Sequence, residues 1–232
     1  MPQNTIIKDG IGDDYTLRSK DVSQAQDNTL RRSMTLATMF PSDYGQNGGA
    51  YHRTSPSTSI MAAGLAANSP IYSFQATNGV LLTLVRRVRV AFWSQDIAFA
   101  AGLATFNLFV ARQFTAQMTG GASADLTGDN SKLRTSFASS SASIMRASTA
   151  ALTGGIFVLD GAPADTMTVG VGTNPYTLFA QAKLFEKPQG EMGLLLTQQE
   201  GFIIQATVPP TGDWSFAVTT EWDEVPLFTA GY

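Results

Sequence analysis

The stretch EGFIIQATVPPTGDWSFAVTTEWDEV, residues Glu200–Val225, decides the fold class. On both sides of a turn built from Pro, Thr and Gly, apolar residues recur at every second position, which is the period of a β-strand with one buried face. Trp214 and Trp222 lie on the apolar face of the second strand, where large aromatic side chains pack in a core. Glu221 and Asp223 lie on its opposite face. Because proline cannot donate to a ladder, we predict a β-hairpin whose strand pairing ends at the turn.

The same period-two pattern recurs along most of the chain, between turns rich in Gly, Pro, Asn and Ser. It predicts strands over residues 71–74, 81–93, 104–114, 155–161 and 167–172. Residues 176–186 fit a helix nearly as well as a strand. Residues 133–137 and 143–148 fit short strands, or the Ser-rich segment between them forms a loop or a helical turn. Since the sequence lacks the crossover helices that parallel strands require, we expect an all-β chain folded as an antiparallel β-sandwich.

One predicted strand, 81–93, is unusually basic, and the end of the chain is unusually acidic. Opposite charges that face each other across neighbouring strands contribute about 0.2–1 kcal/mol each. We therefore predict that strand 81–93 lies beside strand 214–225. The basic residues are Arg86, Arg87 and Arg89, and the acidic residues are Glu221, Asp223 and Glu224.

Composition excludes several classes of function. Charged residues make up only 14% of the 232 residues, against about 25% in an average domain. A net charge of -3 gives no reason to expect nucleic acid or a membrane as partner. With no cysteine and a single histidine, His52, the chain cannot build a thiolate or multi-histidine metal site by itself. No nucleophile elbow, Walker loop or dinucleotide motif occurs, so we predict neither enzymatic activity nor a cofactor.

One loop carries oxygen ligands that calcium favours. Asp125, Asp129 and Asn130 occur within the segment DLTGDNSKLR. Their spacing differs from that of an EF-hand loop, and Asp, Asn and Gly are also the usual residues of tight turns. They are weak calcium candidates, and turn formation is the alternative.

The first fifty residues differ from the remainder in their higher charge and weak periodicity. We interpret residues 1–50 as an extended N-terminal arm and residues 51–232 as the β-sandwich domain. A short helix over Ser23–Met39 is the alternative for part of the arm. The start of the chain lacks the basic and apolar segments of a signal peptide, and the longest apolar stretch, Ile97–Ala111, is too short to cross a bilayer.

Several segments form a characteristic order of short strands rich in Ala, Gly and Thr. They are SPIYSFQ (69–75), LVRRVRVAFW (84–93), FAAGLATFNLFVARQFTAQMTGG (99–121), LTGDNSKLRTSF (126–137), STAALTGG (148–155) and the closing stretch 200–225. In this order, over about two-thirds of the chain, they resemble structural proteins of tailed-bacteriophage virions. The resemblance implies a β-sandwich of the jelly-roll type that packs as a homo-oligomer on the virion. It carries over no catalytic motif.

The function that we expect from the resemblance is that of a capsid decoration, or cement, protein. Such a protein would be made in the host cytoplasm, form a homotrimer, and stabilise the major capsid protein shell through its sandwich and its arm. The alternative is a receptor- or carbohydrate-binding component of the tail, fibre or neck. That alternative requires an exposed aromatic side chain beside polar ones, and Trp93, which shares a strand face with Arg87 and Arg89, and Tyr176 are its candidates.

Overall fold

The computed structural model describes residues 4–8, 14–18, 48–61, 65–187 and 193–226. The chain divides into two compact units, Met1–Asp43 and Tyr44–Tyr232. In the first unit, β1 (Asn4–Lys8) pairs with β2 (Asp14–Arg18) as antiparallel strands. The helix considered over Ser23–Met39 lies outside the described residues.

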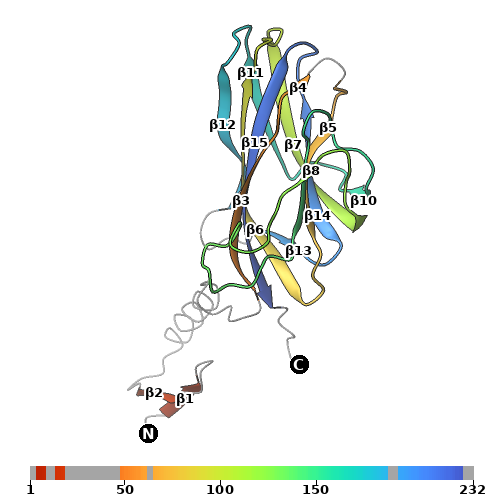
Figure 1. The fold of residues 1–232 in the computed structure, drawn as a ribbon. Helices are drawn as coiled ribbons and strands as arrows, with labels where there is room; N and C mark the ends of the chain where they lie inside the picture. Colours follow the sequence, from red (N-terminus) through yellow and green to blue (C-terminus); the bar gives the residue numbers. More distant parts are fainter. Residues whose placement is uncertain (1–3, 9–13, 19–47, 62–64, 188–192, 227–232) are drawn as a thin grey trace. The chain divides into compact units, whose positions relative to one another are not determined.

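The second unit contains two antiparallel sheets, and among its described residues there is no helix, so the predicted all-β class and sandwich layering are confirmed. One sheet has the strand order β12-β6-β15-β3, with β13 also beside β6 and β4 beside β15. Its strands are β3 (Gly49–Pro56), β4 (Ile60–Met61), β6 (Leu81–Ser94), β12 (Leu178–Glu186), β13 (Leu194–Leu196) and β15 (Asp213–Pro226). We call this the six-stranded sheet (Figure 1).

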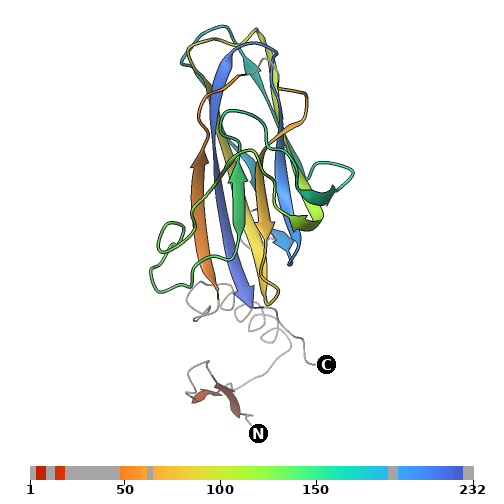
Figure 2. The same cartoon turned by 45° about the vertical axis from the view of Figure 1, so that its right-hand side comes forward.

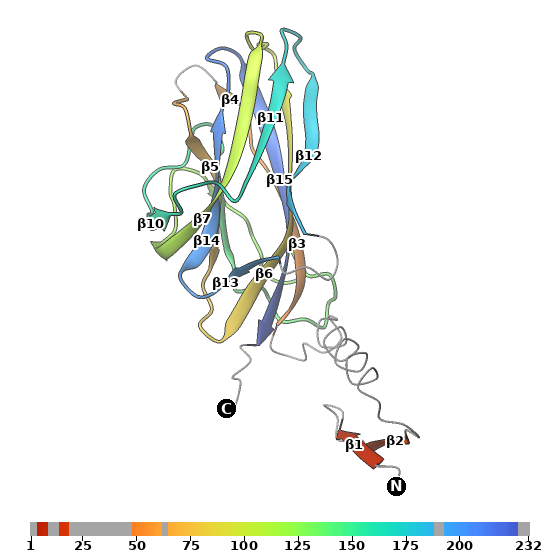
Figure 3. The ribbon, with the colours of Figure 1, turned by 180° about the vertical axis from the view of Figure 1, so that it is seen from behind.

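The other sheet, which we call the seven-stranded sheet, has the order β10-β7-β14-β5-β9-β8, with β11 also beside β7. Its strands are β5 (Ser69–Ala76), β7 (Gly102–Ala116), β8 (Ala122–Ser123), β9 (Ser143–Arg146), β10 (Ile156–Leu159), β11 (Asp165–Val171) and β14 (Glu200–Thr207). The long strands of the two sheets run lengthwise through the unit (Figure 2). Along one side, β11 and β12 lie next to each other, where the two sheets meet (Figure 3).

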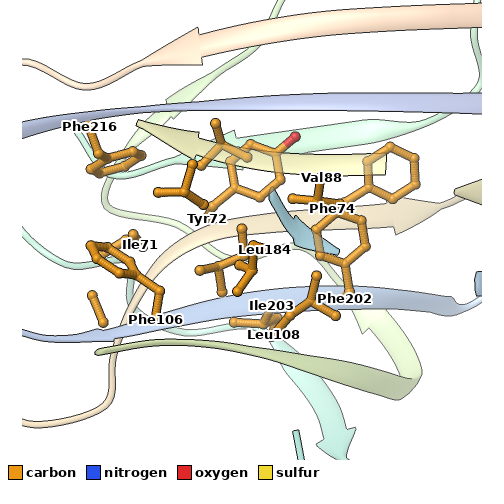
Figure 4. Close-up of a cluster of buried hydrophobic side chains, with 14 of the residues drawn as sticks. Ile71, Tyr72, Phe74, Val88, Phe106, Leu108, Leu184, Phe202, Ile203 and Phe216 are labelled. Atoms are coloured by element: carbon orange, nitrogen blue, oxygen red, sulfur yellow. The ribbon is translucent and has the colours of Figure 1, made fainter. Parts of the chain in front are cut away.

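The core fills the space between the sheets with aromatic and β-branched side chains. Phe74 and Phe202, from neighbouring strands of the seven-stranded sheet, stack with ring centroids 5.2 Å apart. Across the core, Phe74 meets the edge of Trp222 at 5.3 Å, and the Tyr72 hydroxyl hydrogen-bonds Thr220 at 2.9 Å. Figure 4 shows Phe74, Phe202 and Val88 gathered between the two layers. Each buried aromatic removes about 150–250 Å² from water, which makes this cluster the main source of stability.

The predicted hairpin of the closing stretch is wrong in its pairing, although both strands exist. β14 lies in the seven-stranded sheet and β15 in the six-stranded sheet, so the turn between them crosses from one layer to the other. Both strands are apolar on the face toward the core, and this alternation is the same for a hairpin and for two facing layers. Gly212, at φ +99°, lets the crossing turn pass close to the Ala98 carbonyl.

The predicted neighbourhood of strand 81–93 and strand 214–225 is confirmed, because β6 and β15 pair along their whole length. A β-bulge interrupts their register between Glu221 and Trp222, leaving Arg86 without a partner directly opposite it. The extra residue places Arg86 and Arg87 on the same outer face and turns Val85 into the core. Strict alternation along strand 81–93 places Val85 on the face of Arg87 and Arg89, and that expectation is wrong because of the bulge.

The structure decides between the alternatives for the segments that the sequence left open. Residues 176–186, which fit helix or strand, form β12 from Leu178, and β9 occupies the start of 143–148. Residues 133–137 form a turn rather than a strand. The sandwich begins earlier than residue 51, because Gly49 and Ala50 already belong to β3 and are buried.

Candidate functional site

The outer face of the six-stranded sheet carries a ladder of charges that neutralise one another. Arg87 on β6 lies between Glu221 on β15, at 2.5 Å, and Glu186 on β12, at 3.4 Å. Lys183, three residues before Glu186 on β12, also pairs with it. The hydrogen bond from Lys183 holds the pKa of the Glu186 carboxyl below its ordinary value. The Arg89 Nε is buried and has no hydrogen-bond partner among the described residues. Arg87 and Lys183 are therefore paired with acidic residues of the same sheet.

Arg86 and Asp223 form a separate pair on this face. The Asp223 side chain is only 3% exposed, while that of Arg86 is 43% exposed. Burial raises the pKa of Asp223, and the attraction and hydrogen bond of Arg86 lower it by less. Asp223 is therefore a carboxylate that depends on one partly exposed counter-charge. The predicted pairing is confirmed for Arg86 with Asp223 and for Arg87 with Glu221, whereas Arg89 lies opposite Thr219 and forms no ion pair among the described residues.

Glu224 does not follow that prediction, since none of its described contacts is an arginine. Its parity places it on the inner face with Trp222, where it is 1% exposed. It accepts hydrogen bonds from the Ser140 hydroxyl at 2.5 Å, from the Ser141 N–H at 3.0 Å and from the Ser141 hydroxyl at 2.8 Å. The Trp222 indole N–H adds a fourth donor at 3.3 Å. Glu224 thus fastens a Ser-rich loop to β15, a role that periodicity could not reveal.

Both tryptophans of the closing stretch are core residues, as predicted. Trp214 is 0% exposed and lies against Phe92, Phe99 and Phe216, while Trp222 stacks on Tyr51 at 5.6 Å. Neither can present a ring to a ligand. The candidates for an exposed aromatic are therefore Trp93, at the end of β6, and the nearby Tyr176.

At that end, Trp93 lies on the outer face, half-buried, directly opposite Leu178 and Ser215. Tyr176 is 71% exposed, and its hydroxyl donates to the Asp96 carboxylate. This hydrogen bond raises the pKa of the Tyr176 phenol. The sequence-based criterion of an exposed aromatic beside a polar side chain is met at Tyr176.

A different surface lies on the outer face of the seven-stranded sheet, where β11, β7 and β14 run side by side. Thr105 lies opposite Thr168 on one side and Thr207 on the other, and the Thr105 and Thr168 hydroxyls hydrogen-bond at 3.3 Å. In the next row, Asn107 lies between Thr166 and Gln205. We call this surface, made of Thr105, Asn107, Thr166, Thr168, Gln205 and Thr207, the threonine face. It contains no charged side chain.

The calcium candidates form a self-contained turn. One Asp125 oxygen accepts hydrogen bonds from the Thr127 N–H at 2.9 Å and the Thr127 hydroxyl at 2.6 Å, and the other accepts from the Asn130 amide nitrogen at 2.8 Å. The Thr127 hydroxyl also lowers the pKa of Asp125. Asp129 turns away to Lys132, at 3.6 Å. The hydrogen bonds favour a structural turn over a calcium site.

His52 is exposed on β3, opposite Glu221. In the described part of the chain, no three His, Asp or Glu side chains gather closely enough to hold a metal ion, and no helix is long and apolar enough to span a membrane. No protein-family model matches this chain, and a search of curated proteins finds no match. The virion assignment therefore remains a prediction from the sequence.

Proposed function

We propose that this chain is a non-enzymatic structural protein of a tailed-phage virion that decorates and stabilises the head. The order of segments in its sequence supports this assignment. The fold agrees with it, because β-sandwiches of this size are common building blocks of viral shells. The proposed partners are further copies of this chain and the major capsid protein.

We further infer that the sandwich is a jelly roll. A jelly roll has eight main strands in two sheets, and consecutive strands mostly pass from one sheet to the other. The eight longest strands of the second unit are β3, β5, β6, β7, β11, β12, β14 and β15. Their orders, β12-β6-β15-β3 and β11-β7-β14-β5, match the two sheets expected from jelly-roll winding, and this match supports the inference. The crossing turn between β14 and β15 supports the same topology.

The observation that carries the functional proposal is the threonine face. Interface centres are depleted in charged residues, because a charge buried there without a partner costs several kcal/mol. Here two rows of uncharged polar side chains cross three strands, with the 65% exposed Leu103 in the row above. Hydroxyl and amide groups can exchange hydrogen bonds with water for hydrogen bonds with another subunit. We propose that the threonine face is the contact between copies in a trimer.

Light scattering of the purified chain tests this contact. We expect a trimer for the natural sequence and a monomer for Thr168→Arg, which places a charge on the threonine face, directly beside Thr105. Thr54→Arg is the matched control, because Thr54 is an exposed threonine on the outer face of the other sheet. A monomeric natural protein, or a trimer that tolerates Thr168→Arg, would refute the contact.

The role of the first unit is proposed from the sequence, as an arm that extends the contact with the shell. A chain without Met1–Asp43 keeps all strands of the sandwich. We expect it to form the same oligomer but to bind purified heads that lack the protein more weakly than the whole chain does. Unchanged binding to the heads would show that the first unit is not an anchor.

A further inference from the structure

Three loops meet at the end of the sandwich where β6 finishes, and they display apolar side chains to solvent. The loops join β6 to β7, β11 to β12 and β14 to β15, and they lie together at the upper end in Figure 1. The Tyr176 N–H donates to the Gln95 carbonyl at 3.2 Å, and the Gln95 N–H donates to the Asp213 carbonyl at 2.9 Å. We call the side chains of Trp93, Gln95, Asp96, Tyr176 and Leu178 the tip cluster.

Tyr176 is exposed and has an unfavourable backbone conformation. Its φ of 52° lies in the left-handed region, which bulky residues avoid at a cost of about 1–3 kcal/mol. Such strain persists only where the surroundings impose it, and here Ser94 does so. The Ser94 N–H donates to the Thr177 carbonyl at 3.0 Å, and its hydroxyl donates to the Asn174 carbonyl at 2.9 Å and accepts from the Thr177 N–H at 3.0 Å. The loop is therefore anchored on both sides of the tyrosine.

The anchoring presents an aromatic ring of restricted orientation. The Tyr176 hydroxyl is tied to Asp96 at one edge, while 71% of the residue remains exposed. Leu178, two residues further on, is 58% exposed, and Trp93 lies directly opposite it. An aromatic side chain that is already ordered loses little entropy when a ligand stacks on it, and this preorganisation favours binding.

Polar groups beside the ring have unused capacity to accept hydrogen bonds. Asp96 receives the Tyr176 hydroxyl on one carboxylate oxygen, and within the described residues its other oxygen has no donor. Gln95 donates its amide to the Ser215 hydroxyl at 2.7 Å, and that bond directs the amide group while leaving its carbonyl oxygen without a described partner. The ligand that suits this arrangement has one apolar face and several hydroxyl donors.

We propose that the tip cluster is a carbohydrate-binding site, in which a pyranose ring stacks its C–H face on Tyr176 and donates hydroxyls to Asp96 and Gln95. Sugars combine these two properties in one small ring. The exposed side chains come from two short segments, 93–96 and 176–178, which is a small footprint beside the roughly 800 Å² per partner of a standard protein interface. The site is separate from the threonine face and gives the sandwich a second activity, recognition of a glycan.

The test uses the whole chain and a panel of soluble oligosaccharides built from glucose, galactose, mannose, rhamnose and N-acetylglucosamine. Saturation-transfer NMR detects binding, and calorimetric titration measures affinity. We expect at least one oligosaccharide to bind, Tyr176→Phe to bind within a few-fold of the natural protein, and Tyr176→Ala to lose about tenfold or more in affinity. Val80→Ala is the control, because Val80 is 70% exposed in the turn before β6, at the opposite end of that strand.

Three results would overturn the proposal: no oligosaccharide binds, Tyr176→Ala binds like the natural protein, or Tyr176→Ala dissociates the oligomer. The last result would identify the tip cluster as a protein contact instead. Circular dichroism of each variant shows whether it is folded. If the alanine variant unfolds, a loss of more than tenfold in affinity for Tyr176→Phe, which keeps the ring, would overturn stacking as the basis of binding. If no oligosaccharide binds while the natural protein still forms the trimer, this proposal fails and the proposed function stands.

Discussion

Replacing Glu224 by alanine should be among the most damaging single changes on β15. The carboxylate is buried and receives hydrogen bonds from Ser140, Ser141 and Trp222. A hydrogen bond to a charged group contributes about 1.5–3 kcal/mol, but the partly exposed serines can bind water once the carboxylate is gone. The Trp222 indole N–H, which is buried, keeps an unpaid desolvation cost of about 1–3 kcal/mol.

The lost hydrogen bonds to the loop and the desolvation cost of the unpaired indole N–H act together. We therefore expect Glu224→Ala to lower the free energy of unfolding by about 3 kcal/mol. Glu224→Gln keeps the shape of the side chain and one acceptor oxygen, so it should lower the free energy of unfolding by only about 1 kcal/mol. The matched control is Glu221→Ala, three residues earlier on the same strand. Its carboxylate is 30% exposed and bound to Arg87, and such surface pairs contribute about 0–1 kcal/mol.

Urea unfolding followed by tryptophan fluorescence measures all three variants at one protein concentration, since an oligomer's stability depends on concentration. The expected order of loss is Glu224→Ala, then Glu224→Gln, then Glu221→Ala. If Glu224→Ala lost no more than Glu221→Ala, the reasoning that Glu224 organises the Ser-rich loop would be refuted.

Three further variants probe the charges and the crossing turn by the same unfolding assay. Arg86→Met should cost about 1–2 kcal/mol, because it strands the buried Asp223 carboxylate, and adding Asp223→Asn should recover most of the loss; additive effects would contradict the pairing. Burial raises the pKa of Glu200, but hydrogen bonds that include one from Arg112 at 2.5 Å lower it by more. The stability that the ionised carboxylate contributes should therefore disappear as pH falls below about 4.3. Glu200→Gln should abolish that part of the pH dependence. Gly212→Ala should cost about 1–3 kcal/mol, since φ is +99° and the new Cβ would lie 2.8 Å from a carbonyl oxygen; an unchanged midpoint would show that the turn can relax.

Residue periodicity predicted which faces are buried, but not which strands pair. The alternation in β14 and β15 placed Trp214 and Trp222 in the core correctly, because burial of one face imposes that pattern on any strand. The same alternation arises in a hairpin and in two facing layers, so the sequence predicts a hairpin turn where the structure has a crossing turn. Charge complementarity supplied the missing information for β6 and β15, where it identified the neighbouring strand correctly.

The bulge in β6 and the backbone of Tyr176 could not be predicted from the sequence, whereas the inner-face position of Glu224 could. The bulge opposite Glu221 inserts one residue and turns Val85 to the core. Arg86 interrupts the apolar alternation of this strand, but a single exception does not show that a residue is inserted. Charge alone predicts that Glu224 pairs with arginine like its acidic neighbours, although its parity with Trp222 places it on the inner face. The sequence indicates Tyr176 as a candidate aromatic, but its exposure depends on the left-handed backbone that Ser94 stabilises from a distant part of the chain.

The central claim, that this chain is a structural protein of the virion head, is tested most directly by electron microscopy of purified particles. The account predicts density for the sandwich at symmetric positions on the outer surface of the head, in groups of three. A chain that stays monomeric and never appears in particles, or one found only within the tail, would contradict the account.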